Sequence, residues 1–322
     1  MYIAAHLLMT IFALVPTGAA WAQGGYPQKP IRVVIGFPPA SAADIVARVT
    51  GAKMSDGLNQ QVVIDNRPGA SSNIATEAVV RAPADGYTLF MGTIANTINA
   101  SLYPKLNFDF ARDLAPIAAV ASVPNLLVVH PSLPAHSVKE LIGIAKARPG
   151  EILYGSSGNG TSPHLAGELF NLMAGVKLAH IPYKGSPQAM TDLLGGRVMA
   201  MFAPASTALP HIKAGTLRAL AASSAQRTNA APDLPTIAES GLPGFETSVW
   251  FGWLAPAATP RELIERINRE TARALADAEV KKQFAAQGIG AMGGSPEQFA
   301  AYIREETAKW ARVVRASGAK LD

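Results

Sequence analysis

The chain has 322 residues, a formal net charge of +5 and no cysteine. This length is sufficient for two domains, and the lack of cysteine excludes disulfides, thiolate chemistry and a lipoprotein anchor. The basic residues are dispersed and form no stripe interleaved with aromatic residues, so we expect no nucleic-acid partner. A mild positive charge does suit a small anionic ligand.

Residues 1–22 are predicted to be a secretory signal peptide. The apolar run 7–15 is too short to cross a bilayer, for which about 20 residues are needed. It is followed by Ala20-Trp21-Ala22, which has the small-residue pattern of a cleavage site. The stretch before the run contains His6 but no Lys or Arg, which leaves a buried N-terminal helix as the alternative. Cleavage before Gln23 would give a soluble protein of the bacterial periplasm.

Apolar segments and segments of helical periodicity alternate along the rest of the chain. Strands are predicted at residues 31–35, 62–64, 87–91, 125–129, 152–154, 198–202 and 217–221. Helices are predicted to begin near Ala42, Ser72, Ser137, Pro163, Pro187, Pro260 and Pro296. This alternation predicts an α/β protein with mainly parallel sheets.

Several helix starts have capping signals, which are structural and carry no functional weight. Ser137, Thr259 and Ser295 are each followed three residues later by Glu or Gln, the pattern of a capping box. Ser162 and Ser186, each followed by proline, are predicted as N-caps. Stretches rich in Pro and Gly near residues 130–136 and 240–247 are candidate places for the chain to pass between two lobes.

Five loops that follow predicted strands are small, polar or contain glycine: 36–44, 91–96, 155–164, 180–187 and 203–207. Ligands of open α/β sheets bind outside the carboxyl ends of the strands. The loop Gly155-Ser-Ser-Gly-Asn-Gly-Thr-Ser-Pro-His164 is the most informative, because its glycines allow close approach and the following helix start offers free N–H groups to an anion. The alternative is an ordinary capped turn.

Single candidate residues in these loops have structural alternatives. His164 either contacts a ligand or is a surface or capping residue, and Lys184 either pairs with a carboxylate or is solvated. Asp44 is either a general base or a charge at a helix start. The sequence contains no nucleophile elbow, P-loop or dinucleotide fingerprint, and its six histidines have no metal-ligand spacing. We therefore expect no catalytic residues, no cofactor and no metal.

Seven segments in order resemble the Bug, or TctC-like, family, the periplasmic substrate-binding proteins of tripartite tricarboxylate transporters. They are residues 26–32, 66–70, 84–89, 158–165, 180–185, 235–241 and 255–260. The resemblance covers essentially the whole chain after the signal peptide. It implies an α/β, two-lobed Venus-flytrap fold, a type II periplasmic binding protein with a hinge of two crossing strands. The expected first lobe comprises residues 26–123 and 244–322, and the second comprises 124–243.

The resemblance also implies a carboxylate ligand held between the lobes by backbone groups and ordered waters. Carried over to this sequence, the first-lobe contacts are Phe37, Pro39, Ala40, Ser41, Ala43, Asp44, Thr93, Ala95 and Asn96. The second-lobe contacts are Ser156, Ser157, Gly158, Asn159, Gly160, Thr161, His164, Tyr183, Lys184, Gly185 and Ser206.

One loop departs from the family pattern. The family commonly has Pro-Gly-Gly-Ser/Thr-x-Asp where this chain has Pro39-Ala-Ser-Ala-Ala-Asp44, so that two glycines are replaced by residues with a Cβ. A positive φ becomes costly there, and the pocket narrows on that side.

The leading hypothesis is a monomeric periplasmic solute-binding protein that captures a small organic anion and delivers it to membrane permease subunits. One alternative is a sensor whose closed lobes engage a receptor kinase. The other is an exported hydrolase of small esters, against which the missing nucleophile motif argues.

Overall fold

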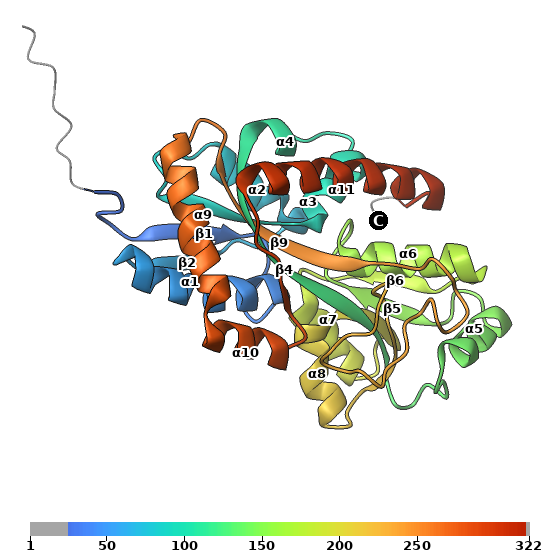
Figure 1. The fold of residues 1–322 in the computed structure, drawn as a ribbon. Helices are drawn as coiled ribbons and strands as arrows, with labels where there is room; N and C mark the ends of the chain where they lie inside the picture. Colours follow the sequence, from blue (N-terminus) through green and yellow to red (C-terminus); the bar gives the residue numbers. More distant parts are fainter. Residues whose placement is uncertain (1–24, 320–322) are drawn as a thin grey trace, which may run out of the picture.

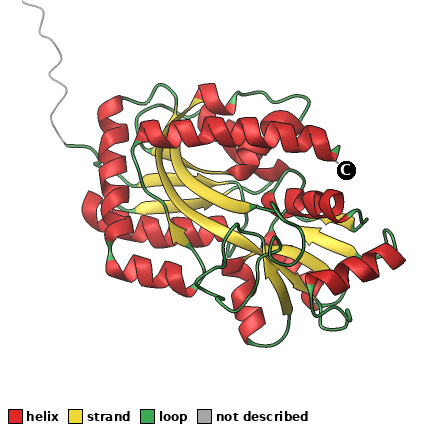
Figure 2. Cartoon of the chain, turned by 45° about the vertical axis from the view of Figure 1, so that its right-hand side comes forward, coloured by secondary structure: helices red, strands yellow, loops and turns green. Residues whose placement is uncertain are grey.

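The computed structural model describes residues 25–319, so the predicted signal peptide lies outside the described residues. Figure 1 shows two α/β lobes, with β4 and β9 running from one into the other. Helices surround the strands of both lobes (Figure 2). Within the described part of the chain, no helix is both long and apolar enough to cross a membrane.

The first lobe is a mixed sheet in the order β2-β1-β3-β9-β4, with β10 added to β4. β1 is parallel to β2 and β3, whereas β9 is antiparallel to β3 and β4. The strands are β1 (Ile31–Ile35), β2 (Val62–Asn66), β3 (Thr88–Thr93), β4 (Leu114–Val129), β9 (Ser248–Pro256) and β10 (Gly290–Ala291). Its helices are α1 (Ala42–Leu58), η1 (Ala70–Ser72), α2 (Asn73–Val80), α3 (Ile94–Leu102), α4 (Phe110–Asp113), α9 (Arg261–Ala276), α10 (Ala278–Ala286) and α11 (Pro296–Ser317).

In the second lobe, the last part of β4 pairs antiparallel with β7 and β8, and β5 lies between β7 and β6. The strands are β5 (Leu153–Ser156), β6 (Ala179–Pro182), β7 (Ala200–Pro204) and β8 (Arg218–Ala222). The helices are α5 (Val138–Ala147), α6 (Ser162–Ala174), α7 (Ser186–Leu194) and α8 (Ala205–Lys213). Parallel strands followed by helices place the carboxyl ends of β5, β6 and β7 at one edge, as in other open α/β sheets.

The hinge is centred on β4, a strand of 16 residues that belongs to both sheets. Residues up to Pro124 pair with β9, and Asn125 is the first to pair with β7. The chain returns through Thr247 into β9. Ser223 links the two segments that cross between the lobes. Its Oγ donates to the Thr247 carbonyl (2.6 Å) and accepts from the Asn125 amide (3.2 Å). All three residues are fully buried.

The expected crossing at residues 130–136 is wrong. These residues connect β4 to α5 inside the second lobe, because β4 itself carries the chain between the lobes. The other stretch, 240–247, leads directly into β9, although Phe245 packs in the core of the second lobe.

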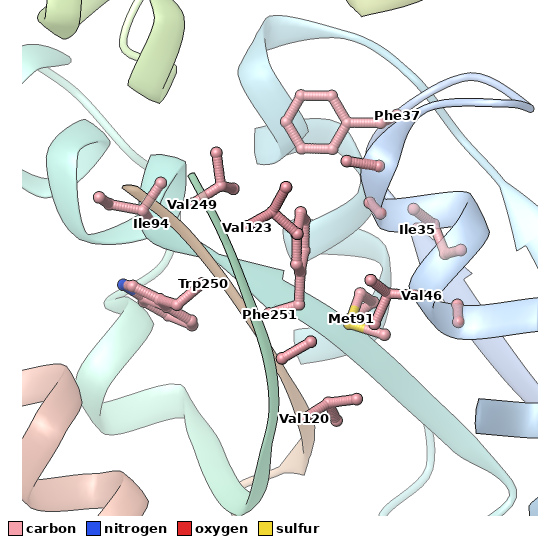
Figure 3. Packing of buried hydrophobic residues seen from close by; sticks show 14 of the residues in the cluster. Ile35, Phe37, Val46, Met91, Ile94, Val120, Val123, Val249, Trp250 and Phe251 are labelled. Atoms are coloured by element: carbon pink, nitrogen blue, oxygen red, sulfur yellow. The ribbon is translucent and has the colours of Figure 1, made fainter. Parts of the chain in front are cut away.

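β4 also links the two apolar cores. Leu126 and Val128 belong to the larger core, which extends across the hinge, whereas Leu127 and Val129 belong to the core of the second lobe. This division follows from the alternation of side chains along a strand. Figure 3 shows part of the larger core around the hinge strands, where Val120 and Val123 of β4 lie beside Phe251 of β9.

The predicted helix starts are near the observed ones, but not all of the predicted caps form. The capping box at Ser295 is confirmed, and Ser137 accepts from the Glu140 amide. Thr259 does not cap α9, since Pro260 is the N-cap residue and the buried Thr259 hydroxyl has no partner among the described residues. α6 and α7 begin at Ser162 and Ser186, one residue earlier than predicted, so neither serine is an N-cap.

We predict that Ser223→Ala lowers the free energy of unfolding by about 1–3 kcal/mol, because the Thr247 carbonyl and the Asn125 amide lose a buried partner. Urea denaturation measures the change. Ser224→Ala is the matched control, since the Ser224 hydroxyl donates to the Gln226 carbonyl at the surface, and we expect a change within about 0.5 kcal/mol. Equal effects of the two substitutions would contradict a stabilising role of Ser223 at the hinge.

Candidate ligand-binding site

A small cavity lies between the lobes where the strands of both sheets end. Its volume is about 30 Å³, which is space for about two water molecules. The lining residues are Phe37, Ser41, Ala42, Ala43, Thr93, Ile94, Ala95, Ser157, Thr161, Ser162, Pro163, Ser186, Pro204, Val249 and Phe251. The two lobes are therefore nearly in contact around it.

Five helices begin at this cavity. The first turns of α1, α3, α6 and α7 contribute lining residues, and Pro204, the N-cap of α8, is another. The first N–H groups of a helix have no partner within the helix, and the helix dipole places partial positive charge at the same end. Helix starts from both lobes thus make the cavity electropositive without any ionised side chain.

Hydroxyl groups from both lobes add donors. The Oγ of Ser41 and the Oγ1 of Thr93 each accept an amide of the following helix turn, at 3.3 and 3.1 Å, which leaves their own hydrogens available to donate. In the second lobe, the hydroxyl oxygens of Ser157 and Ser186 lie 2.7 Å apart. One hydrogen forms that bond, and the other can donate to a ligand.

The rest of the wall is apolar. Val249 and Phe251 lie on the same face of β9, since they are two residues apart in a strand. Figure 3 shows them near Ile94 at the start of α3, with Phe37 at the opposite side of the same region. Pro163 and Pro204 complete this wall from the second lobe. Among the described residues that line the cavity, none is ionisable.

The amino-acid sequence matches a known family over most of the chain. The model of the tripartite tricarboxylate transporter family receptor, TctC, matches residues 46–319. The chain belongs to this family. BugT of Bordetella pertussis is 41% identical over 298 residues, which cover 92% of this chain and 91% of BugT. The family membership that the sequence motifs predicted is therefore confirmed.

Solved structures of TctC and Bug proteins have the same fold. Rpa4515 of R. palustris, solved with adipate, has a TM-score of 0.90 and 38% identity, covering 92% of this chain and 100% of that one. MatC of Rhodopseudomonas palustris, with bound malate, has a TM-score of 0.86 and 28% identity, covering 90% and 100%. These matches confirm the predicted two-lobed type II binding-protein fold. Members of the family are periplasmic solute-binding proteins.

Seven of the residues predicted to contact the ligand line the cavity of this family member: Phe37, Ser41, Ala43, Thr93, Ala95, Ser157 and Thr161. Four others, Gly158, Asn159, Tyr183 and Lys184, line a second cavity of about 270 Å³ at the mouth of the cleft, which Ser157 also lines. Tyr183 donates to Asp192, and burial together with this bond raises the pKa of the Tyr183 phenol to about 12.

The remaining predicted contacts line neither cavity. Pro39 and Ala40 are exposed, and Gly185 lies against Pro38. Asn96 accepts the Thr93 amide and so completes the capping box of α3. Ser206 is buried in α8, and its hydroxyl has no partner among the described residues.

Asp44 is buried but directed away from the cavity. Its carboxylate accepts from the Ala40 amide (3.0 Å), from Arg48 and from Asn66 (3.0 Å). Burial alone would raise the pKa of Asp44, but the hydrogen bonds from Arg48, Ala40 and Asn66 outweigh it and hold the pKa below its usual value. The carboxylate therefore orders the start of α1, which is the structural alternative for this residue.

His164 supports the glycine loop. Its Nδ1 accepts the Gly160 amide at 3.1 Å, and its ring stacks on that of His180 with centroids 4.2 Å apart. Ser156 lies in the same buried group, with its Oγ 2.6 Å from Nε2 of His180. Burial, with a smaller contribution from His180, lowers the pKa of His164 to about 3. His164 is therefore neutral at physiological pH and acts on the loop, behind the cavity wall.

The mouth of the cleft is closed by direct contact between the lobes. Ser71 of the first lobe donates to the Asn159 carbonyl of the second. Ala70, Ser71 and Ser72 all have positive φ, of 44°, 49° and 77°. Left-handed backbone costs about 1–2 kcal/mol for each such residue, and strain of this kind is retained at functional sites.

Eight lining residues were not predicted from the sequence: Ala42, Ile94, Ser162, Pro163, Ser186, Pro204, Val249 and Phe251. Six of them lie inside the five loops that the sequence singled out. Val249 and Phe251 come from β9, which was not predicted as a strand, so no local signal pointed to them. In the described residues, no group of three His, Asp or Glu side chains is placed to hold a metal ion.

We predict that Ala40→Gly raises the free energy of unfolding by about 0.5–1 kcal/mol. Of the two residues predicted to replace family glycines, Ala42 lies in the first turn of α1, whereas Ala40 has a φ of 61° and is strained. Ala42→Gly is the control, because glycine in the first turn of α1 should instead lower stability by up to about 1 kcal/mol. Thermal melting compares the two, and destabilisation by both would show that Ala40 is not strained.

We predict that the stability of the protein falls between pH 6.5 and 3 in part because of His164. Its folded pKa of about 3 lies below the ordinary value of 6.5, so unfolding takes up a proton in this range and the free energy of unfolding falls as the pH falls. The slope from this group is at most about 1.4 kcal/mol per pH unit. His164→Asn should reduce it, while His136→Asn at the surface should not. An unchanged slope in His164→Asn would exclude this origin.

Proposed function

We propose that this chain is exported to the periplasm, captures a small carboxylate between its lobes as a monomer, and delivers it to membrane subunits of a tripartite tricarboxylate transporter. It would do so without catalysis. The observation that carries the proposal is the convergence of helix starts and free hydroxyl hydrogens from both lobes on one cavity. The adipate and malate bound to the two related structures support an organic acid as the ligand.

The available interactions are sufficient for micromolar binding, which corresponds to about 8 kcal/mol. Each helix terminus contributes about 0.3–1 kcal/mol toward an anion, and each hydrogen bond to a charged group contributes about 1.5–3 kcal/mol. A few hydroxyl and amide donors together with the helix starts therefore reach the required free energy only when both lobes contact the same carboxylate.

The closed arrangement depends on glycines that let the lobes approach each other. A Cβ on Gly160 would lie 2.3 Å from Oδ1 of Asn99 and 2.9 Å from Leu102 in the first lobe. A Cβ on Gly185 would lie 2.5 Å from the ring of Pro38. Both contacts cross the cleft, so side chains at these positions would hold the lobes apart.

The proposal is tested with pairs of an acid and its amide. Calorimetry with hexanoate against hexanamide, and adipate against adipamide, should show that at least one acid binds and that its amide loses several kcal/mol, because charge-assisted hydrogen bonds are lost. Small-angle scattering should show compaction with the acid only. Equal affinity for acid and amide without compaction would reject carboxylate capture.

We predict that Gly160→Ala weakens acid binding by about tenfold or more, because the new Cβ prevents closure against Asn99. Gly175→Ala is the matched control. Gly175 also has a positive φ, 61° against 77° for Gly160, but a Cβ there meets nothing within 4 Å. Both variants should therefore lose similar stability, and only Gly160→Ala should lose affinity and compaction. Equal affinity in the two variants would show that closure does not involve the glycine loop.

A further inference from the structure

We infer that the acid taken by this chain is a monocarboxylate with a compact apolar body, and that the apolar wall of the cavity selects against a second carboxylate. The inference rests on the proposed function, because it names the ligand class of the same cavity. It separates this chain from its related structures, whose ligands, adipate and malate, are both dicarboxylates.

The donors of the cavity match one carboxylate. A carboxylate has two oxygens with about four acceptor positions in all. The hydroxyl hydrogens available are those of Ser41 and Thr93 and one from the pair Ser157 and Ser186. Thr161 and Ser162 also line the cavity, but their hydroxyls already donate to the carbonyls of Gly158 and Ser248. These three hydroxyls, together with amides of the neighbouring helix starts, can satisfy one anionic group.

The opposite requirement, a surface for an apolar body, is met by side chains from three separate elements. Phe37 follows β1, Ile94 begins α3, and Val249 and Phe251 lie on β9. All four are buried, with at most 8% of the side chain exposed. Figure 3 shows Val249 and Phe251 at the hinge strands, with Ile94 to one side and Phe37 to the other. Contact with this wall stabilises an apolar group by removing it from water.

Asp44 and Lys184, the two charged residues of the predicted site, do not line this cavity. The Asp44 carboxylate accepts from Ala40, Arg48 and Asn66 and does not line the cavity. Lys184 is exposed and lines the separate cavity at the mouth. A second carboxylate that reached the apolar wall would therefore be strongly disfavoured, because an ionised group has no partner there.

The test compares acids that differ only in the second carboxylate. Isothermal titration calorimetry at pH 7 with hexanoate against adipate, and butyrate against succinate, should give the monocarboxylate at least about tenfold tighter binding in each pair that binds. Binding of adipate or succinate as tight as that of its partner, or tighter, overturns the inference and leaves the proposed function standing. Failure of all four acids, and of malate, to bind would instead reject the proposed function.

A variant tests the wall itself. Phe37→Lys places a cation in the apolar surface and should shift the preference by about tenfold or more toward adipate relative to hexanoate. Phe37→Met keeps the wall apolar and should retain the preference for hexanoate. Thermal melting checks that both variants are folded. If Phe37→Lys does not fold, the comparison of hexanoate with adipate and of butyrate with succinate in the wild-type protein decides the question. An unchanged preference in folded Phe37→Lys would show that this wall does not contact the ligand body.

Discussion

The shared strand β4 is the constraint on which the rest of the structure depends. Because one strand pairs in both sheets, the strand ends of the two lobes face each other across a single cleft. The hinge strands are hydrogen-bonded to Ser162, which lines the cavity. Nδ2 of Asn125 donates to the Ser162 hydroxyl (2.7 Å), and this hydroxyl donates to the Ser248 carbonyl (3.3 Å). The start of α6 is thus bonded to both crossing strands. The position of this part of the cavity wall is therefore tied to both hinge strands by hydrogen bonds.

Local patterns predicted the elements well but the caps less well, because the fold shifts where a helix begins or engages the hydroxyl elsewhere. The hydroxyl of Ser186 is 2.7 Å from that of Ser157, and Ser162 is bonded to the hinge, so neither is available to cap its helix. Thr259 has the sequence of a capping box, yet Pro260 takes the N-cap position. Ser295 has no such competitor and forms the box that its sequence predicts. A capping pattern in the sequence shows that a hydroxyl could cap a helix. Whether the cap forms depends on the tertiary structure around it.

The candidate site could be predicted from the sequence at the level of loops. Glycine, serine and threonine after a strand indicate a ligand loop, and the cavity forms where five such loops meet. Single residues were harder, because Asp44 and His164 act on neighbouring backbone and not on the cavity. Val249 and Phe251 could not be found at all, since their place depends on the pairing of β9 with β4 over more than a hundred residues. The expected lobe limits stay a prediction, and the packing of Phe245 in the second core bears on where the later limit lies.

An uncharged cavity suits the proposed capture of a ligand by closure of the two lobes. A ligand shifts an equilibrium between open and closed forms only by its difference in affinity for the two. An arginine in one lobe would bind the carboxylate in the open form as well, and this would reduce the difference. Here the donors are divided, with Ser41 and Thr93 in one lobe and Ser157 and Ser186 in the other. In the binding mode that we propose, each half alone is too weak, so most of the binding free energy becomes available only as the lobes meet.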